Sequence, residues 1–431
     1  MASLTPQSSN PDSSGLPFSK KYSQYVLFIL TGVYVFKFID RQILVILQES
    51  IKKELGLSDT QLGLMSGFTF AVFYVSFGIP IARLADKGNR KNIITIALIV
   101  WSGMTAISGM AQNFFHLLLA RMGVGVGEAG GSPPAYSIIS DLYPPEKRAT
   151  ALAIYSTGIS IGILIGFAVG GWINQHFGWR TAFFVIGIPG VIYALIFFFT
   201  VKEPARGLFE KTTLTEADHS LKEVVLFLWR SKSFRYLALG GGMATYSAYA
   251  GNSWIPPFLS RVHGMRSDEI GYWLSLLFGI AGGLGYFMGG FLTDKMGKLE
   301  KRWYLWLPAA ALITAIPFSL TVYFASDSKV VLTLLAIPIF LLAIYLAPCI
   351  ALTHGIAGIR MRALASAIFL FVINILGLGC GPLVTGMVSD LLMPSMGVES
   401  LRWALSSSLV ANVLGAILFL IAAKTLRNEL K

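Results

Sequence analysis

Five charged side chains stand inside two long apolar segments of the chain. Lys37, Asp40 and Arg41 lie in one segment, and Arg121 and Glu128 lie in the other. If these segments are membrane helices, each charge costs about 2.5–3.5 kcal/mol at the helix centre. Charges kept at that cost pair with one another, carry protons or bind a charged ligand. The residue types therefore indicate ion pairing, proton transfer and recognition of a charged group, provided that the segments cross a membrane.

The spacing of these residues suggests which of them meet. Asp40 and Arg121 lie at similar distances from the expected ends of their segments, so they reach a similar depth and could pair. Glu128 follows two helical turns after Arg121 on the same face, about 10 Å deeper. A carboxylate there loses its hydration, which makes Glu128 a candidate proton carrier. We take Asp40, Arg41, Arg121 and Glu128 as the site for protons and a substrate head group. A purely structural ion pair is the alternative, and Lys37 is expected to extend to the membrane surface, outside the site.

The composition indicates that the apolar segments do cross a membrane. Of the 431 residues, 55% are hydrophobic and only 13% are charged, and the mean hydropathy is +0.67. Ordinary globular proteins carry about 25% charged residues, so a soluble or a disordered chain is excluded. The two cysteines, Cys349 and Cys380, lie in apolar runs and are interpreted as packing residues, which leaves no disulfide scaffold or metal site.

Apolar stretches of the length that crosses a bilayer, about 20 residues, recur along the whole chain. We predict an all-α membrane protein with twelve transmembrane helices, at 23–48, 60–84, 92–112, 114–141, 149–173, 180–201, 233–259, 268–293, 303–325, 329–357, 361–391 and 402–424. Most of the 34 Lys and Arg residues fall on one side of this arrangement, which places the N- and C-termini in the cytoplasm. The net charge of +12 then follows from topology, and a nucleic-acid partner is not required.

The predicted helices divide into two bundles of six. Residues 1–19 are expected to form a disordered tail, 20–201 the first bundle, 202–232 a cytoplasmic linker, 233–424 the second bundle and 425–431 a C-terminal tail. Within the linker, the stretch HSLKEVVLFLWRS has apolar residues at helical spacing, which predicts an amphipathic helix on the membrane surface.

Short patterns recur at the same distance in the two bundles. Leu62-Gly63 corresponds to Ile270-Gly271, and the Leu-x-Asp that ends in Asp86 corresponds to the one that ends in Asp294. Two parallel halves of six helices resemble the plan of the major facilitator superfamily, in which the substrate site lies between the halves. A channel is disfavoured by this repeat.

The loop GIPIARLADKGNRKN resembles the signature loop of that superfamily, and GGFLTDKMGK is its second copy. We expect Asp86, Arg90, Lys91 and Asp294 to act as a conformational switch. A carboxylate at Asp86 can lie against the N-terminus of a neighbouring helix, while the basic residues bind lipid head groups.

Three stretches of the first half resemble the Spinster family of lipid transporters: FIDRQILVILQESIKKELGLSDTQLGLM, ADKGNRK and VGVGEAGGSPPAYSIISDLYPPEKRA. The resemblance implies proton-linked transport of lysophospholipids or sphingosine-1-phosphate, with roles for Asp40, Arg41, Arg121 and Glu128. The Gly-x-Gly-Glu-Ala pattern is also similar to that of organic-anion and sugar-acid symporters, which remain the alternative.

The second half offers aromatic and amide side chains among apolar neighbours, and we expect some to line a substrate cavity: Tyr246, Asn252, Trp254, Tyr345 and Asn374. One charged and one apolar half suit an amphipathic substrate, although any single aromatic residue could equally be a core residue. The sequence thus predicts a monomeric secondary transporter of an amphipathic lipid, proton-coupled and working by alternating access, in the bacterial inner membrane. Neither an enzymatic constellation nor a cofactor is expected.

Membrane-impermeant labelling of single cysteines tests the predicted topology. In intact cells, positions 52 and 329 should react, because they lie in outer loops, and positions 91, 211 and 431 should not. Labelling of position 211 without labelling of position 52 would refute the arrangement.

Overall fold

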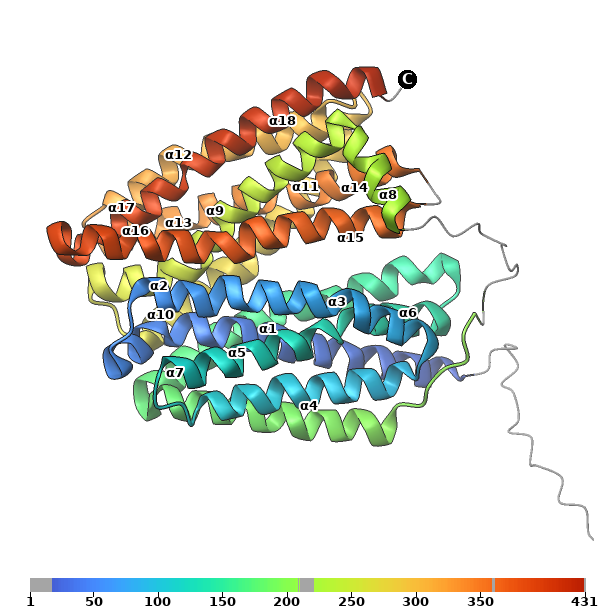
Figure 1. Cartoon of the computed structure of the whole chain (residues 1–431), viewed down its shortest axis with the longest axis horizontal. Coiled ribbons are helices and arrows are strands. Elements are labelled where there is room, and N and C mark those ends of the chain that lie inside the picture. Colours follow the sequence, from blue (N-terminus) through green and yellow to red (C-terminus); the bar gives the residue numbers. More distant parts are fainter. Residues whose placement is uncertain (1–17, 208, 210–220, 359–360, 430–431) are drawn as a thin grey trace, which may run out of the picture.

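The computed structural model describes residues 18–207, 209, 221–358 and 361–429. The expected N-terminal tail, apart from its last two residues, and the middle of the expected linker lie outside the described residues. The described chain is helical, without a strand. It forms two bundles that lie side by side, with most helices running roughly along the longest axis (Figure 1). In Figure 1 the blue-to-green bundle comes from the first half of the chain, and the yellow-to-red bundle comes from the second half.

The first helix of the first bundle begins and ends at capping residues. Ser19 caps the start of the first helix by accepting from the Tyr22 N–H, and Gly56 ends that helix with a left-handed backbone, φ 65°. The helices are α1 (Lys20–Leu55), α2 (Asp59–Gly63), η1 (Leu64–Phe68), α3 (Thr69–Lys87), α4 (Arg90–Ser108), α5 (Phe114–Ala129), α6 (Ser132–Leu142) and α7 (Pro145–Thr200).

The second bundle follows α8 (Leu221–Arg230), a helix in the stretch expected to be amphipathic. Its helices are α9 (Lys232–His263), α10 (Ser267–Leu276), η2 (Leu277–Gly282), α11 (Gly283–Gly297), α12 (Trp303–Phe324), α13 (Ser328–Ala343), α14 (Leu346–Ala357), α15 (Arg362–Ile373), η4 (Asn374–Gly379), α16 (Cys380–Met396), η5 (Gly397–Glu399), α17 (Ser400–Ser408) and α18 (Val410–Glu429). Because α18 continues to Glu429, most of the expected C-terminal tail is helical.

Seven helical segments of the described chain are long and apolar enough to cross a membrane. Pro145–Thr200 contains two crossings, since its backbone turns at Gly178 with φ 81°, and Leu364–Leu426 contains two crossings separated by η5. With α1, with α5 and α6 together, and with α9, these segments make the twelve expected crossings. The segment predicted as one helix over 114–141 is broken at Gly130 and Gly131.

Three π-helical turns interrupt the helices at which the bundles face each other. They are η1 between α2 and α3, η2 between α10 and α11, and η4 between α15 and α16. A π-turn holds an extra residue within a helix and is frequent at functional sites. In this protein η1 packs directly on η4, so two of these turns meet across the bundles.

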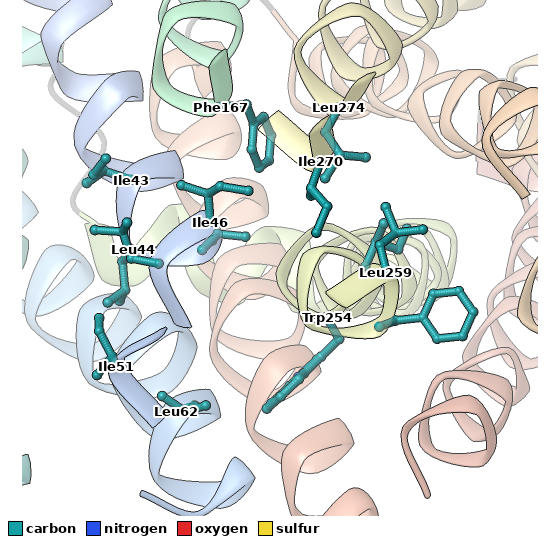
Figure 2. Close-up of a cluster of buried hydrophobic side chains, with 14 of the residues drawn as sticks. Ile43, Leu44, Ile46, Ile51, Leu62, Phe167, Trp254, Leu259, Ile270 and Leu274 are labelled. Atoms are coloured by element: carbon teal, nitrogen blue, oxygen red, sulfur yellow. The ribbon is translucent and has the colours of Figure 1, made fainter. Parts of the chain in front are cut away.

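The bundles share one hydrophobic cluster at the end opposite the linker, which we call the distal end. Figure 2 shows side chains of α1, α2 and α7 packed with side chains of α9 and α10. The helices approach closely there: a Cβ atom on Gly63 would lie 2.4 Å from the Pro382 carbonyl oxygen, and one on Gly171 would lie 2.3 Å from the Ser267 carbonyl oxygen. The two halves are therefore closed against each other at the distal end.

Candidate functional site

The charged side chains of the first bundle converge where α1, α3 and α5 meet. Arg41 Nε of α1 donates to Glu128 Oε2 of α5 at 2.8 Å, and the Glu128 side chain is completely buried. The second carboxylate oxygen of Glu128 has no hydrogen-bond partner among the described residues. This salt bridge joins two of the four residues that the sequence analysis selected.

Two aromatic rings of α3 lie between the cations. Phe70 and Tyr74 stack with ring centroids 5.6 Å apart. The Arg41 guanidinium lies 4.9 Å from the Phe70 centroid and 5.2 Å from the Tyr74 centroid, Arg121 lies 5.7 Å from Phe70, and Lys37 Nζ lies 4.9 Å from Tyr74. We call these five residues the cation–aromatic ladder. Ring faces attract cations, so the ladder stabilises its charges while leaving N–H donors unused.

Arg121 and Asp40 are the members of the site without hydrogen bonds. Nε and Nη1 of Arg121 and both carboxylate oxygens of Asp40 are buried and have no partner in the described part of the chain, and Asp40 is only 1% exposed. The expected Asp40–Arg121 ion pair is therefore not formed. Its prediction used depth alone, whereas adjacent residues point about 100° apart around a helix, and on α1 it is Arg41 that reaches α5.

Lys37 belongs to the site, contrary to the expectation that it extends to the membrane surface. It is 3% exposed, and its Nζ donates to Ser132 Oγ at 3.0 Å, to the Glu128 carbonyl oxygen at 3.3 Å and to the Tyr74 hydroxyl at 3.4 Å. The spacing in the sequence could have indicated this placement, since residues three and four positions apart share a helix face. Lys37 stands in that relation to Asp40 and Arg41.

The residues of the second half that were expected to line a cavity differ in their burial and in their hydrogen-bond partners. Asn252 reaches across the bundles, where its Nδ2 donates to Gln42 Oε1 at 3.4 Å. Tyr345 is buried and shares a hydrogen bond of 2.6 Å with Thr245 Oγ1. Tyr246 is partly buried on the same helix as Asn252.

Two further residues of that set make contacts within the helical framework. Asn374 is partly exposed, and its Nδ2 donates to the Leu370 carbonyl oxygen of its own helix. Trp254 has no exposed surface, and its indole N–H donates to the Pro382 carbonyl oxygen at 2.8 Å. The assignment of Trp254 to a cavity is therefore wrong for this conformation, because its ring packs in the distal hydrophobic cluster (Figure 2).

The signature loop is tied to the first bundle by Arg90. This residue is 1% exposed and pairs with Asp141 and with Glu203, whose Oε1 lies 2.7 Å from Arg90 Nε. Arg90 therefore does not bind lipid head groups as expected, because its guanidinium is buried among acceptors of α6 and of the start of the linker. Lys91 Nζ lies 4.5 Å from the Phe198 ring centroid.

Asp86 and Asp294 are exposed, and neither carboxylate makes a hydrogen bond or an ion pair with a described residue. Both carboxylates of the two signature loops are therefore disengaged in this conformation.

An ionic cluster that the sequence did not predict joins the two bundles at the distal end. Arg261 of α9, 6% exposed by its side chain, donates to both oxygens of Asp59 at 2.7 and 2.8 Å and to Glu49 Oε2 at 2.5 Å. Lys52 Nζ adds a contact of 2.5 Å to Asp59. The predicted helix ended at residue 259, which placed Arg261 in an outer loop and hid its role.

The same cluster uses the N-terminus of α2. Asp390 of α16 accepts from the backbone N–H groups of Asp59 at 2.9 Å and Thr60 at 2.7 Å. Carboxylates are stabilised at helix N-termini by unpaired N–H groups and the helix dipole. We call Glu49, Lys52, Asp59, Arg261 and Asp390 the distal cluster.

Comparison with known proteins agrees with this architecture. Residues 30–375 match the family model described as Major Facilitator Superfamily. An MFS-type efflux pump of Mycolicibacterium smegmatis is 32% identical over 406 residues, which cover 93% of each chain. A hexuronate transporter of Bacillus subtilis is 26% identical over 382 residues, 86% of this chain and 89% of that one. The crystal structure of a bacterial homologue of the human lysosomal transporter Spinster, described as inward-facing and unoccupied, superposes with a TM-score of 0.87 at 32% identity, covering 96% of this chain and 99% of that chain.

The chain therefore belongs to the Major Facilitator Superfamily, whose members are integral membrane transporters. Its similarity over almost its whole length to the solved Spinster homologue makes it a Spinster-type member, as the motifs around Asp40, Asn89 and Glu128 indicated.

Replacing Arg261 by Met should open the distal end. The change leaves Asp59 and Glu49 with too little positive charge, and breaking one side of a buried ion pair costs about 3–5 kcal/mol. Distances between spin labels at positions 53 and 398, which are exposed on opposite bundles, should become longer and broader. Arg266→Met removes an exposed arginine from the same end and serves as the control. Identical distance distributions in Arg261→Met and the unsubstituted protein would contradict this role.

Proposed function

We propose that this transporter moves an amphipathic anion, a lysophospholipid or a sphingoid-phosphate-like lipid, by proton-coupled alternating access. The observation that carries the proposal is the cation–aromatic ladder, in which the buried Arg121 keeps unused donors. The lipid head group would bind at the ladder, and the acyl chain would extend along the second bundle.

The charges of the site favour an anionic head group. Lys37, Arg41 and Arg121 supply three cations, whereas Asp40 and Glu128 supply two carboxylates, so the site carries surplus positive charge even when both carboxylates are ionised. A buried surplus charge is costly, and an anion would offset it. Arg121 offers two unbonded donors, and arginine binds phosphate through parallel hydrogen bonds.

Aromatic residues continue from the ladder into the second bundle. Tyr249 of α9 packs against the hydrophobic cluster of the first bundle that contains Phe70, and Tyr345 is buried in the hydrophobic cluster of the second bundle. Tyrosine presents an apolar ring with a polar tip. A chain of CH₂ groups, each gaining about 0.8 kcal/mol on burial, suits this surface better than a hydroxylated sugar acid does.

The closed distal end supports an inward-facing assignment for this conformation, like that of the similar solved structure. Alternating access then requires the distal cluster to break as the opposite end closes. We assign the closing contact to the signature loops: Asp86, four residues before the buried Arg90, would reach a helix N-terminus of the second bundle, and Asp294 would act in the second copy. Both carboxylates are free for this purpose in the present conformation.

Coupling to protons follows from competition for Arg41. A substrate anion that binds Arg41 displaces Glu128, and a displaced carboxylate in a buried site favours its neutral form. Both carboxylate oxygens of Asp40 are buried without a hydrogen-bond partner in the described part of the chain. Substrate binding and protonation of these two carboxyl groups are therefore linked.

Glu128→Gln and Asp40→Asn should make transport independent of the proton gradient, because an amide cannot exchange a proton. Substrate flux into liposomes, with and without an imposed pH gradient, measures this. We expect the gradient to accelerate flux in the unsubstituted protein and to lose that effect in both variants. Asp268→Asn, which changes a carboxylate at the distal end, serves as the control. Normal pH dependence in both site variants would exclude this proton path.

A second candidate, transport of small organic anions or sugar acids, is favoured by the similarity to the hexuronate transporter along most of its length. The same cations could bind a carboxylate. A sugar acid, however, needs polar partners on every side, and sites built for such partners discriminate strongly for them. In the second bundle the described polar candidates, such as Tyr345 and Asn374, already bond to protein atoms.

Competition binding to purified protein separates the two candidates. Lysophospholipids or sphingoid phosphates should displace a fluorescent lysolipid, and affinity should increase with acyl-chain length until the apolar surface is filled. Arg121→Gln should weaken binding by about tenfold or more, since it removes a charge-assisted contact. Binding of hexuronate without binding of any lysolipid would transfer the assignment to the second candidate.

A further inference from the structure

Lys37 differs from the other cations of the ladder because its ammonium group already uses three acceptors of the protein. Ser132 Oγ, the Glu128 carbonyl oxygen and the Tyr74 hydroxyl accept from Nζ at 3.0, 3.3 and 3.4 Å. An ammonium has three donors, so none is left for a ligand. All three acceptors are neutral groups, and no ion pair involving Lys37 exists among the described residues.

The break between α5 and α6 provides the place for this cation. α5 ends at Ala129 and α6 begins at Ser132, so the Glu128 carbonyl is among the last of α5. Helix C-termini carry partial negative charge and attract cations, and broken helices in transporters bind cations through such carbonyls. The rings of Tyr74 and Tyr34, with centroids 4.9 and 6.0 Å from Nζ, add their faces. Lys37 is thus held by dipoles and ring faces, and no carboxylate of the described residues lies within ion-pair distance of it.

The charge of Lys37 acts at short range on the head-group site. Lys37 Nζ and the Arg41 guanidinium lie 4.9 and 5.2 Å from the same Tyr74 centroid. They are therefore at most about 10 Å apart, and across that distance a unit charge changes the binding constant of another unit charge by about tenfold at an effective dielectric constant of about 20.

We propose that Lys37 determines the charge preference of the head-group site: without touching the substrate, it favours a dianionic head group over a monoanionic one by about tenfold. This inference rests on the proposed function, because it takes the ladder as the head-group site. Lys37 is then a specificity-determining residue, separate from Arg41 and Arg121, which would bind the anion.

Two lysolipids with the same acyl chain but different head-group charge test the inference. At pH 8 lysophosphatidic acid carries a phosphomonoester with about two charges, whereas lysophosphatidylglycerol carries a phosphodiester with one. The measured quantity is the ratio of the two Kd values on one preparation. Misfolded protein lowers the number of sites but leaves this ratio unchanged.

Lys37→Met should reduce the preference for lysophosphatidic acid about tenfold, and Lys37→Gln should do the same. Lys37→Arg, which keeps the charge, should retain the preference. Lys424→Met removes an exposed lysine of α18 in the other bundle and should also retain it. An unchanged ratio in a folded Lys37→Met or Lys37→Gln variant overturns the inference.

Failure of the proposed function gives a different result. In that case the unsubstituted protein binds neither lysolipid, whatever residue stands at position 37. The charge preference is then measured with galactarate, a dianion, and galacturonate, a monoanion, on the same variants. The expected tenfold change and the result that would overturn it stay the same.

Discussion

Surplus positive charge, buried where α1, α3 and α5 meet, is the constraint on which the structure of the first bundle depends. Such charge is unstable in an apolar medium unless dipoles or ring faces surround it. The Phe70 and Tyr74 rings, the Glu128 carboxylate and the carbonyls at the end of α5 supply that surrounding. The break at Gly130 and Gly131 is part of the same solution, because it exposes helix-end carbonyls inside the bundle. The apolar second bundle has no such requirement, and this asymmetry defines where a charged group can bind.

Two kinds of contact hold the distal end together, and they differ in how easily they separate. The hydrophobic cluster is broad and buries side chains of both bundles, yet glycines such as Gly63 and Gly171 let the helix backbones meet without interlocking side chains. The distal cluster is directional, and its charged groups regain hydration when water enters, which offsets part of the lost attraction. The distal contact can therefore be stable while water is excluded and can separate when water enters. Alternating access requires both properties.

Hydropathy and repeats sufficed to predict the fold, because crossing a bilayer demands long apolar helices and the two halves repeat their loops. The Asp40, Arg41, Arg121 and Glu128 set could be selected because charges in apolar segments are rare. Their partners could not be predicted, since the direction of a side chain around a helix axis depends on packing: Arg41 rather than Asp40 reaches α5, and Lys37 turns inward. The positions of Arg261 and Trp254 were predicted wrongly for a different reason. Each lies near the end of α9, where a residue's surroundings depend on the conformation of both bundles.

The π-turn η1 has a geometric consequence for the ladder. It ends at Phe68 and is followed without interruption by α3, which carries Phe70 and Tyr74. Relaxing its wide turn into ordinary α-helical bonding would move the following residues by one position, which is a rotation of about 100° about the helix axis. Both rings would swing away from Arg41 together. A shift of one residue in the hydrogen bonding of η1 would therefore give the stacked Phe70 and Tyr74 rings a second orientation. Because η4 packs on η1, such a shift would be coupled to the helix of the other bundle.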